Sequence, residues 1–382
     1  MTDPVPYFAN LDCERRWAGR PPLPRAIAAR VAAMSTLVRA FSDGGAVALI
    51  PIAEVDPGAI SGVDLPPLEL RAPHTPAPDD AAAWGGFRQA HAMTSAAPHA
   101  RAVPSQPACA VRLADTLDNR EAARDAAGDA AGDRDPRACD RAIRRANLAP
   151  PADAALARRV NQRFWAALLG ERLGVNPDGT QRITRLAQLE AALARWPGRP
   201  WVCKAALTAA GRDRTWGHGA ELSSAARAQI GQWIAECGGV VLEPWRQRIA
   251  DVGITGAVGA QVWVRAPHRL VVDARGGFVG IDVDAHDLNR DESAAFVACA
   301  RAVGDALAGE GFRGPFAVDG YVYIDEHGDR RLHPLCEVNA RSSFGHVAWA
   351  LAQHLGRPRL RVGKFDGDPL VRMAGGVRVV MQ

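Results

Sequence analysis

Apolar and polar positions follow two different periods along residues 150–382 of this chain. Apolar residues recurring every three to four positions predict amphipathic helices, and short apolar or alternating runs bounded by turn residues predict strands. The predicted helices cover 153–173, 185–196, 222–237, 291–309 and 344–355, with Asp153 and Thr184 as N-caps of the first two. The predicted strands cover 199–204, 239–245, 258–265, 269–273, 278–284, 315–324 and 330–339. Because several strands follow one another through short turns, this region is predicted to be an α+β fold with a meander and a hairpin.

The N-terminal third gives a different pattern. Residues 24–41 have helical spacing, and GGAVALIPI at 44–52 is a continuous apolar run typical of a buried parallel strand. A helix followed by such a strand predicts an α/β unit. Residues 56–110 show little periodicity, and 121–136 (EAARDAAGDAAGDRDP) contain few large apolar side chains to bury. We therefore expect a surface insertion and a domain boundary near 115–150.

Length and composition narrow the class of protein. A chain of 382 residues is long enough for two or three packed units. The net charge of +4, from 46 basic and 42 acidic residues, is too balanced to predict a nucleic-acid partner. The seven cysteines are scattered without C-x-x-C spacing, which favours a reducing compartment over a disulfide framework or a structural zinc site. With neither a signal peptide nor an apolar run of membrane-spanning length in the sequence, we expect a cytoplasmic protein without a membrane partner.

The segment LCEVNARSSFGH at 335–346 places unusual chemistry at the end of an apolar strand. Glu337, Asn339 and Arg341 are two apart, so they share one face of a strand that extends this far. Asp319 lies in the middle of the preceding apolar strand, FAVDGYVY. Three oxygen ligands on one face would suit Mg²⁺. A structural ion pair of Asp319 with Arg341 or Arg313 explains the same spacing equally well.

Two further positions are less specific by themselves. Lys204 ends the strand WVCK before a loop with glycines at 205–219, where a lysine and backbone N–H groups would hold phosphates. A solvated lysine at a strand end is the more common explanation of such a position. Glu243 ends the strand VVLEP, either as a simple strand terminator or as part of a hinge that contacts a purine.

Taken in order, these motifs resemble the ATP-grasp superfamily. The resemblance rests on VCK with AAGRDRTWGHG, then VVLEP, GPFAVDGYVY and CEVNAR, and it covers about residues 155–355. It implies an ATP-grasp fold preceded by an N-terminal α/β pre-ATP-grasp domain. The implied organisation is 1–115 for the N-terminal domain, 116–150 for a low-complexity insertion or linker, 151–240 for a small subdomain with the phosphate-binding loop, and 241–382 for a large subdomain with the Mg/ATP site.

The resemblance also implies a role for each matching residue. Lys204 would contact the phosphates of ATP, and Arg163 stands where the family usually has a first phosphate-contacting lysine, a change that keeps the charge and alters the geometry. Asp319, Glu337 and Asn339 would hold one or two Mg²⁺ ions. The remaining implied residues are Gly211, Gly217 and Gly219 in a loop closing over the phosphates, Glu243, Pro244 and Trp245 as the adenine hinge, Asp251 on the ribose, and Arg341 beside the transferred phosphoryl group. A solvated surface acid explains Asp251 nearly as well, Arg212 and Arg214 are either solvated or in contact with an anion, and Cys336 is expected to point away from the site into the core.

The activity implied is an ADP-forming ligase that activates a small carboxylate as an acyl phosphate and joins it to an amine. Amino-acid or peptide-like substrates are a family-level expectation, with Arg265, Arg269 and Arg313 as candidate carboxylate contacts. The alternatives are an ATP-grasp kinase that phosphorylates a small molecule and a non-catalytic nucleotide-binding protein. Homodimerisation is common in the family, although no motif in this sequence indicates it.

Overall fold

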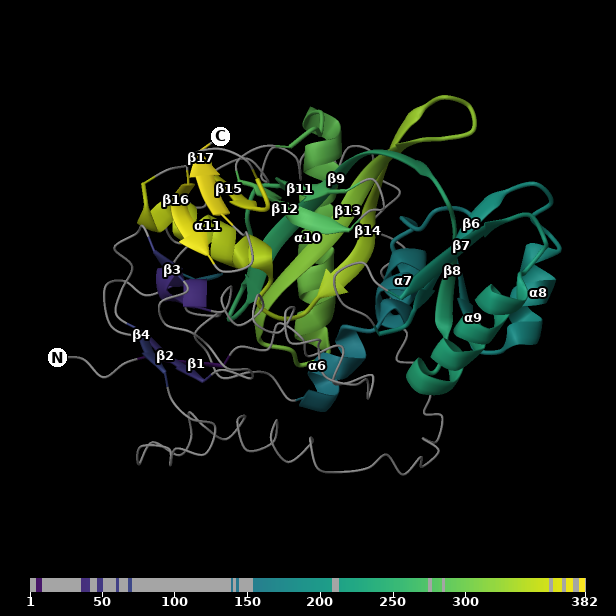
Figure 1. Cartoon of the computed structure of the whole chain (residues 1–382), viewed down its shortest axis with the longest axis horizontal. Helices are drawn as coiled ribbons and strands as arrows, with labels where there is room; N and C mark the ends of the chain where they lie inside the picture. The colour runs from purple at the N-terminus through teal and green to yellow at the C-terminus, as the bar shows by residue number, and fades with distance from the viewer. Residues whose placement is uncertain are drawn as a thin grey trace.

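Three sheets and the helices around them make up the part of the chain that the structure describes (Figure 1). The computed structural model describes residues 5–8, 36–41, 47–50, 60–61, 68–70, 139, 142–143, 154–207, 213–273, 277–283, 286–356, 360–365, 369–373 and 378–381. The predicted insertion at 121–136, most of the predicted helix at 24–41, and Gly211 and Arg212 lie outside these residues.

The N-terminal sheet has three parallel strands in the order β1-β2-β4. They are β1 (Val5–Phe8), β2 (Val47–Ile50) and β4 (Leu68–Leu70). β2 lies inside the strand predicted at 44–52, and its parallel pairing on both sides agrees with the buried parallel strand expected there. The 3-10 helix η1 (Thr36–Phe41) precedes β2.

The small sheet is antiparallel, with the order β5-β8-β6-β7. Its strands are β5 (Gln181–Ile183), β6 (Pro200–Ala205), β7 (Arg214–His218) and β8 (Val240–Pro244). Helices α8 (Leu186–Leu193) and α9 (Ser224–Cys237) cover one face. Trp201, Leu189, Leu193 and Trp233 form the core between sheet and helices. Since β8 belongs to this sheet, the sheet continues past the subdomain boundary predicted at 240/241.

The large sheet carries ten of the described strands. Its path is β14-β13-β9-β11-β12-β15-β17-β16-β3, and β10 pairs with β9. The strands are β3 (Ile60–Ser61), β9 (Gln247–Val258), β10 (Val262–Val264), β11 (His268–Val272), β12 (Phe278–Asp282), β13 (Gly314–Ile324), β14 (Arg330–Asn339), β15 (Leu360–Gly363), β16 (Pro369–Met373) and β17 (Arg378–Met381). Helices and antiparallel strands are mixed throughout residues 154–365, so this region is α+β, as predicted.

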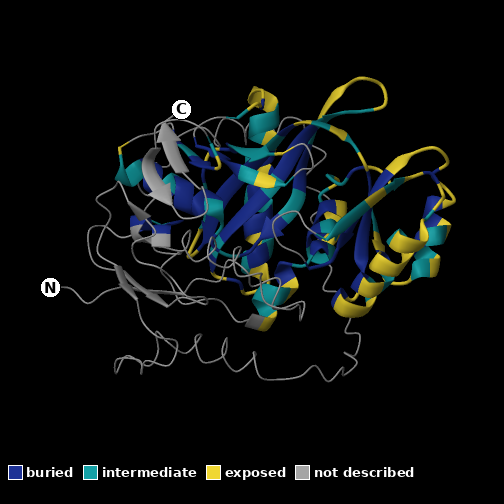
Figure 2. Ribbon diagram, in the orientation of Figure 1, coloured by how far each residue is buried: buried dark blue, intermediate teal, exposed yellow. Residues whose placement is uncertain are grey.

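Helices α10 (Arg290–Gly309) and α11 (Phe344–His354) pack on the large sheet, and α7 (Arg163–Arg172) contacts its edge strand β14. Helix α10 buries Phe296, Val303 and Leu307 against Val252 and Phe316 of the central strands. Helix α11 follows β14 and contacts β9, β12 and β15. Figure 2 shows the resulting distribution, with buried strands inside and exposed residues on the outer sides of α8 and α9. No described helix combines the length and the apolar character needed to cross a membrane.

Several sequence expectations need correction. The single helix predicted at 153–173 is two helices, α6 (Ala154–Val160) and α7 (Arg163–Arg172). Asn161 lies at the break, where its side chain accepts a hydrogen bond from Ala340 N–H at 2.9 Å, so the chain turns to meet the end of β14. Thr184 does not cap α8, because its N–H and hydroxyl both bond to Gln188 Oε1 and Arg185 occupies the N-cap.

The longest strand of the large sheet, β9, was predicted only at its last residue. Its segment QRIADVGITGAV contains charged residues and glycines that obscure the apolar pattern. The strand forms because β13 and β11 pair with it on both sides. The helices predicted at 222–237, 291–309 and 344–355 are confirmed by α9, α10 and α11, and the hairpin predicted at 315–324 and 330–339 by β13 and β14.

Candidate active site

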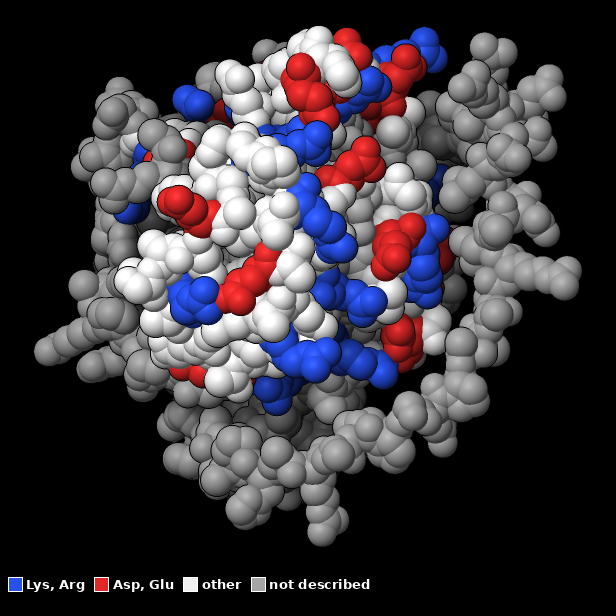
Figure 3. Space-filling view, turned by 90° about the vertical axis from the view of Figure 1, so that its right-hand side faces the viewer, with Lys and Arg blue, Asp and Glu red and all other residues white. Residues whose placement is uncertain are grey.

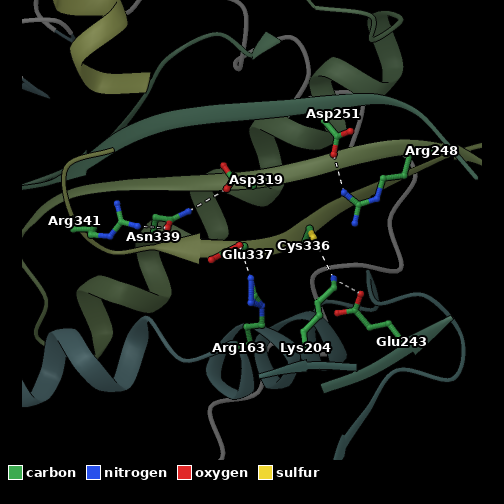
Figure 4. Close-up of polar contacts among 10 residues, drawn as sticks. All are labelled: Arg163, Lys204, Glu243, Arg248, Asp251, Asp319, Cys336, Glu337, Asn339 and Arg341. Atoms are coloured by element: carbon green, nitrogen blue, oxygen red, sulfur yellow. Dashed lines mark hydrogen bonds and ion pairs between the residues drawn. The ribbon is translucent and has the colours of Figure 1, made fainter. Parts of the chain in front are cut away.

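The register of the large sheet brings the predicted metal ligands together. Asp319 on β13 lies directly opposite Glu337 on β14, and Asn339 follows two residues later opposite Ala317. Directly opposite residues share a face of the sheet, as do residues two apart along a strand. Asp319, Glu337 and Asn339 therefore lie on one face, and Figure 4 shows this face turned toward the small sheet.

A bulge in β14 accounts for the local orientation of its side chains. Asp319 pairs with Glu337 but Tyr321 pairs with His333, so two steps on β13 match four on β14. Pro334 lies inside this irregular stretch, where a residue without an N–H is tolerated. The prediction that Cys336 points into the core is wrong, because Cys336 Sγ is 3.5 Å from Lys204 Nζ. The strict alternation assumed from the sequence does not hold across the bulge.

The opposing wall of the site comes from the small sheet. Lys204 on β6 is opposite Arg214 on β7, and Val202 is opposite Glu243 on β8, so all four share one face. The other face of β6, with Trp201, Cys203 and Ala205, is buried in the small core. Lys204 and Glu243 therefore point across to Cys336 on the large sheet, as Figure 4 shows.

Lys204 and Glu243 form a buried ion pair with an Nζ–Oε2 distance of 2.5 Å. Their side chains are only 6% and 7% exposed. Burial alone would raise the pKa of Glu243. The charge and hydrogen bond of Lys204, together with the charges of His333 and Arg163, outweigh burial, so this pKa is lowered and the carboxylate stays ionised. The lysine predicted to hold phosphates is thus bound to an acid that the sequence assigned to the adenine hinge.

Arg163 links α7 to the metal-ligand face. Its Nη2 is 2.8 Å from Glu337 Oε2, and its backbone N–H donates to Ala206 O at the end of β6. Burial alone would lower the pKa of Arg163, but nearby negative charge, mainly that of Glu337, keeps it raised. Its Nε and Nη1 are buried without a hydrogen-bond partner among the described residues. A buried guanidinium with two free N–H groups beside the site is suited to an incoming phosphate.

Asp319, Asn339 and Arg341 form a chain of contacts along the strand end. Asn339 Nδ2 donates to Asp319 Oδ2 at 3.1 Å, and Arg341 Nη2 donates to Asn339 Oδ1 at 3.0 Å. Burial, followed by the charge of Glu337, raises the pKa of Asp319 to about 7. Two partly buried carboxylates that repel each other are what a cation would stabilise.

The donor set can be compared with the needs of Mg²⁺. Asp319 and Glu337 supply carboxylate oxygens, and Asn339 supplies an amide oxygen once its side chain turns from Arg341. In the described parts of the chain, no three His, Cys, Asp or Glu side chains are grouped so that they could hold a metal ion. Since Mg²⁺ usually takes only one or two carboxylates together with substrate phosphates, this smaller set fits the ion.

An arginine and three aromatic side chains form a cluster at the predicted adenine hinge. Arg248 Nη1 is 2.8 Å from Asp251 Oδ1, and its guanidinium lies 4.1 Å from the centre of the Tyr321 ring and 6.0 Å from that of Trp245. Trp245 is partly exposed and also packs near Trp216, with ring centres 6.1 Å apart. Asp251, predicted on the ribose, is therefore neither isolated nor simply solvated.

The phosphate-loop glycines are only partly where the sequence placed them. Gly217 and Gly219 lie at and just beyond the far end of β7, since Gly217 pairs with Trp201 and Gly219 N–H donates to Arg199 O. At the other end of this strand pair, Lys204 of β6 is opposite Arg214 of β7. A Cβ on Gly217 would lie 2.2 Å from the Trp201 ring, so this glycine is required by packing rather than by phosphate. Gly217 and Gly219 therefore lie within and after β7, and their contact with phosphate stays a prediction.

Arg248 is an addition to the predicted site, and it lies near Arg214, for which the sequence left both a solvated position and an anion contact open. Burial, then the charges of Arg248 and Arg163, lower the pKa of Arg214, which brings these three guanidinium groups into one neighbourhood. The sequence pattern did not predict Arg248 as a site residue, because it did not predict β9 as a strand. Seen from the side of α8 and α9 (Figure 3), by contrast, Lys and Arg are interspersed with Asp and Glu, and Arg227 pairs with Glu190 between these helices.

The comparisons with known proteins give structural matches only. No protein-family model and no curated protein sequence matches the chain. Among solved structures, it is similar to N5-carboxyaminoimidazole synthetase from Staphylococcus aureus with ADP (11% identity, TM-score 0.41, 56% of this chain and 59% of that one). It is also similar to carboxyaminoimidazole ribonucleotide synthase from Aspergillus clavatus with ATP (14%, 0.40, 56% and 59%) and to D-alanyl-alanine synthetase A from Vibrio cholerae (12%, 0.40, 53% and 62%).

These solved structures are ATP-grasp enzymes, the superfamily that the sequence motifs resemble. The chain spans less than two thirds of the length of each of the three. At such low TM-scores and identities the matches carry no argument about activity or substrate. The functional interpretation therefore depends on the residues of the site itself.

Proposed function

We propose that this chain is an ATP-dependent ligase that converts a small carboxylate into an acyl phosphate and joins it to an amine, releasing ADP and phosphate. The single observation that carries the proposal is the facing arrangement of the two sheets. One wall presents Asp319, Glu337 and Asn339, and the other presents Lys204, with Arg163 between them. This arrangement offers ligands for a divalent cation and buried cations for phosphates in one place.

The chemistry requires two anions to be brought together. A carboxylate oxygen attacks the γ-phosphorus of ATP, the bond to the β-phosphate oxygen breaks, and ADP leaves. The amine nitrogen then attacks the acyl carbon, the bond to the phosphate oxygen breaks, and the nitrogen loses a proton. Both steps need positive charge near the phosphoryl oxygens and exclusion of water from the acyl phosphate.

Each cation has a defined position for this task. Lys204 would exchange its contact with Glu243 for the phosphates, and Arg163 would offer its two free N–H groups while holding Glu337. Arg341, at the end of β14, would bind the oxygens of the transferred group. Mg²⁺ held by Asp319, Glu337 and Asn339 would neutralise phosphate charge. Trp245 and Arg248 would border the purine, and Asp251 the ribose.

The test is ADP release in the presence of Mg²⁺ with small carboxylates and amines supplied singly and in pairs. A ligase releases ADP in stoichiometric amounts only when both substrates are present. Glu337→Gln should abolish this release, whereas Glu310→Gln, which removes a surface partner of Arg159, should leave it unchanged. ADP release that needs no amine and yields a stable phosphorylated product would indicate a kinase instead, and unchanged turnover in Glu337→Gln would refute the metal assignment.

A further inference from the structure

The site-facing side of the large sheet continues beyond Asp319. Across the strands, Asp319 is opposite Gly253 on β9, and Gly253 is opposite His268 on β11. One register position further, Thr255 on β9 is opposite Ala317, which is opposite Asn339. His268 and Thr255 therefore lie on the same face as the predicted metal ligands. His268 is two strands, or about 10 Å, from Asp319.

The first turn of α11 covers this part of the sheet. A Cβ built on Gly345 would lie 2.8 Å from Thr255 Cγ2 and 3.0 Å from the His268 ring, so both side chains touch the helix there. A Cβ on Gly253 would lie 2.6 Å from His268 Nε2, so the imidazole also lies against the strand next to Asp319. The two glycines allow the imidazole to fit between helix and sheet.

Two polar atoms in this layer, Thr255 Oγ1 and His268 Nδ1, are buried without a hydrogen-bond partner among the described residues. Thr255 is fully buried, and His268 is 2% exposed. Leaving such groups unpaired is costly, and native proteins rarely do so without a ligand or a functional reason.

One buried arginine and a helix N-terminus lie near these two side chains. The backbone N–H of Arg265 donates to Thr255 O, and the charge of Arg265 adds to burial in lowering the pKa of His268 to about 3. Burial likewise lowers the pKa of His346 on α11 to about 3, with contributions from Arg265 and Arg341. The N-terminal end of α11 contributes its own partial positive charge. The surroundings favour an anion over a cation or a neutral apolar group.

We propose that Thr255 and His268 form a subsite, under the first turn of α11, that binds the carboxylate group of the substrate. Thr255 Oγ–H and His268 Nδ1–H would donate to the carboxylate oxygens, and Arg341 at the neighbouring strand end would direct the group toward the phosphates. This inference rests on the proposed ligase function and specifies its carboxylate site. Neither residue follows from the sequence motifs.

The experiment measures thermal unfolding of the full-length protein with MgADP while acetate is titrated, with chloride at equal ionic strength as the reference. Acetate is the smallest carboxylate with a methyl group, so it probes the subsite without knowledge of the true substrate. Thr255→Val removes the hydroxyl at nearly constant shape, and Thr255→Ser is the matched control that keeps it. Because the hydroxyl is unpaired without ligand, Thr255→Val should fold with a Tm equal to or above that of the wild type.

The proposal predicts that acetate raises the Tm of the wild type and of Thr255→Ser, and that this rise is lost in Thr255→Val and in His268→Gln. An equal rise in Thr255→Val, or a wild-type response no larger than that to chloride, would overturn it. A large drop in the Tm of Thr255→Val without acetate would also overturn it, because the hydroxyl would then be serving the fold. The measurement needs no turnover, so a protein that binds acetate but never releases ADP would refute the ligase function and leave the subsite standing.

Discussion

Replacing Lys204 separates its structural role from its proposed contact with phosphate. The Nζ–Oε2 contact with Glu243 is 2.5 Å long, and neither side chain is more than 7% exposed. Lys204→Met would leave the Glu243 carboxylate buried without its main cation. Loss of one partner of a buried ion pair typically costs about 3–5 kcal/mol. We expect the lower end, about 3 kcal/mol, since the charge of Arg163 also acts on Glu243.

The double variant Lys204→Met with Glu243→Gln removes both charges. Its free energy of unfolding should return to within about 1 kcal/mol of the wild type, because replacing both members of a buried pair is often nearly neutral. Its ATP affinity should nevertheless stay more than tenfold weaker, since the proposed phosphate contact is absent. Urea denaturation supplies the free energies, and calorimetric titration with MgATP supplies the affinities.

Two results would refute this reasoning. If the double variant were as unstable as the sum of the two single variants, the ion pair would not couple the two sheet positions. If ATP affinity recovered together with stability, Lys204 would serve the fold and not the nucleotide. Glu310→Gln, which breaks an exposed pair with Arg159, is the control and should change stability by less than about 1 kcal/mol.

Three further predictions concern pH, the metal face and the corrected loop. Burial lowers the pKa of His333 to about 4, so from about pH 6.5 downward the unfolded chain takes up a proton that the folded one does not; between pH 6.5 and 5 the wild type should lose about 2 kcal/mol more unfolding free energy than His333→Gln in urea titrations, and equal losses would contradict this. Glu337→Gln should raise at least tenfold the Mg²⁺ concentration that half-maximal ATP binding requires in calorimetry. An unchanged Mg²⁺ requirement would show that Glu337 is not a metal ligand. Gly217→Ala should lower the free energy of unfolding by about 1–3 kcal/mol, because its Cβ would meet the Trp201 ring. The ATP affinity of the folded variant should be unchanged. A loss of ATP affinity without a loss of stability would show that Gly217 contacts the phosphates.

Much of the element order was readable from the sequence because it depends on local periodicity and on turns between short segments. Helix α9 begins where Ser223 accepts a hydrogen bond from Ala226 N–H, and β13 and β14 are joined by the polar turn at 325–329. The two-residue spacing of Glu337 and Asn339 correctly placed them on one face, since neither lies within the bulge. Asp319 on the preceding strand lies directly opposite Glu337 for the same reason, and its role as a metal ligand stays a prediction.

Local sequence patterns therefore predict the hairpin, the main helices and the candidate metal face. The residues that lie opposite this face depend on long-range packing. Only the packing of α7 and the small sheet onto β14 pairs Arg163 with Glu337 and brings Lys204 to Cys336. β9 is a strand because β13 and β11 pair with it on both sides. His268 on β11 shares a face with Asp319 because both are opposite Gly253 of β9. Contacts between residues far apart in the chain depend on register, bulges and layer packing, which local periodicity does not encode.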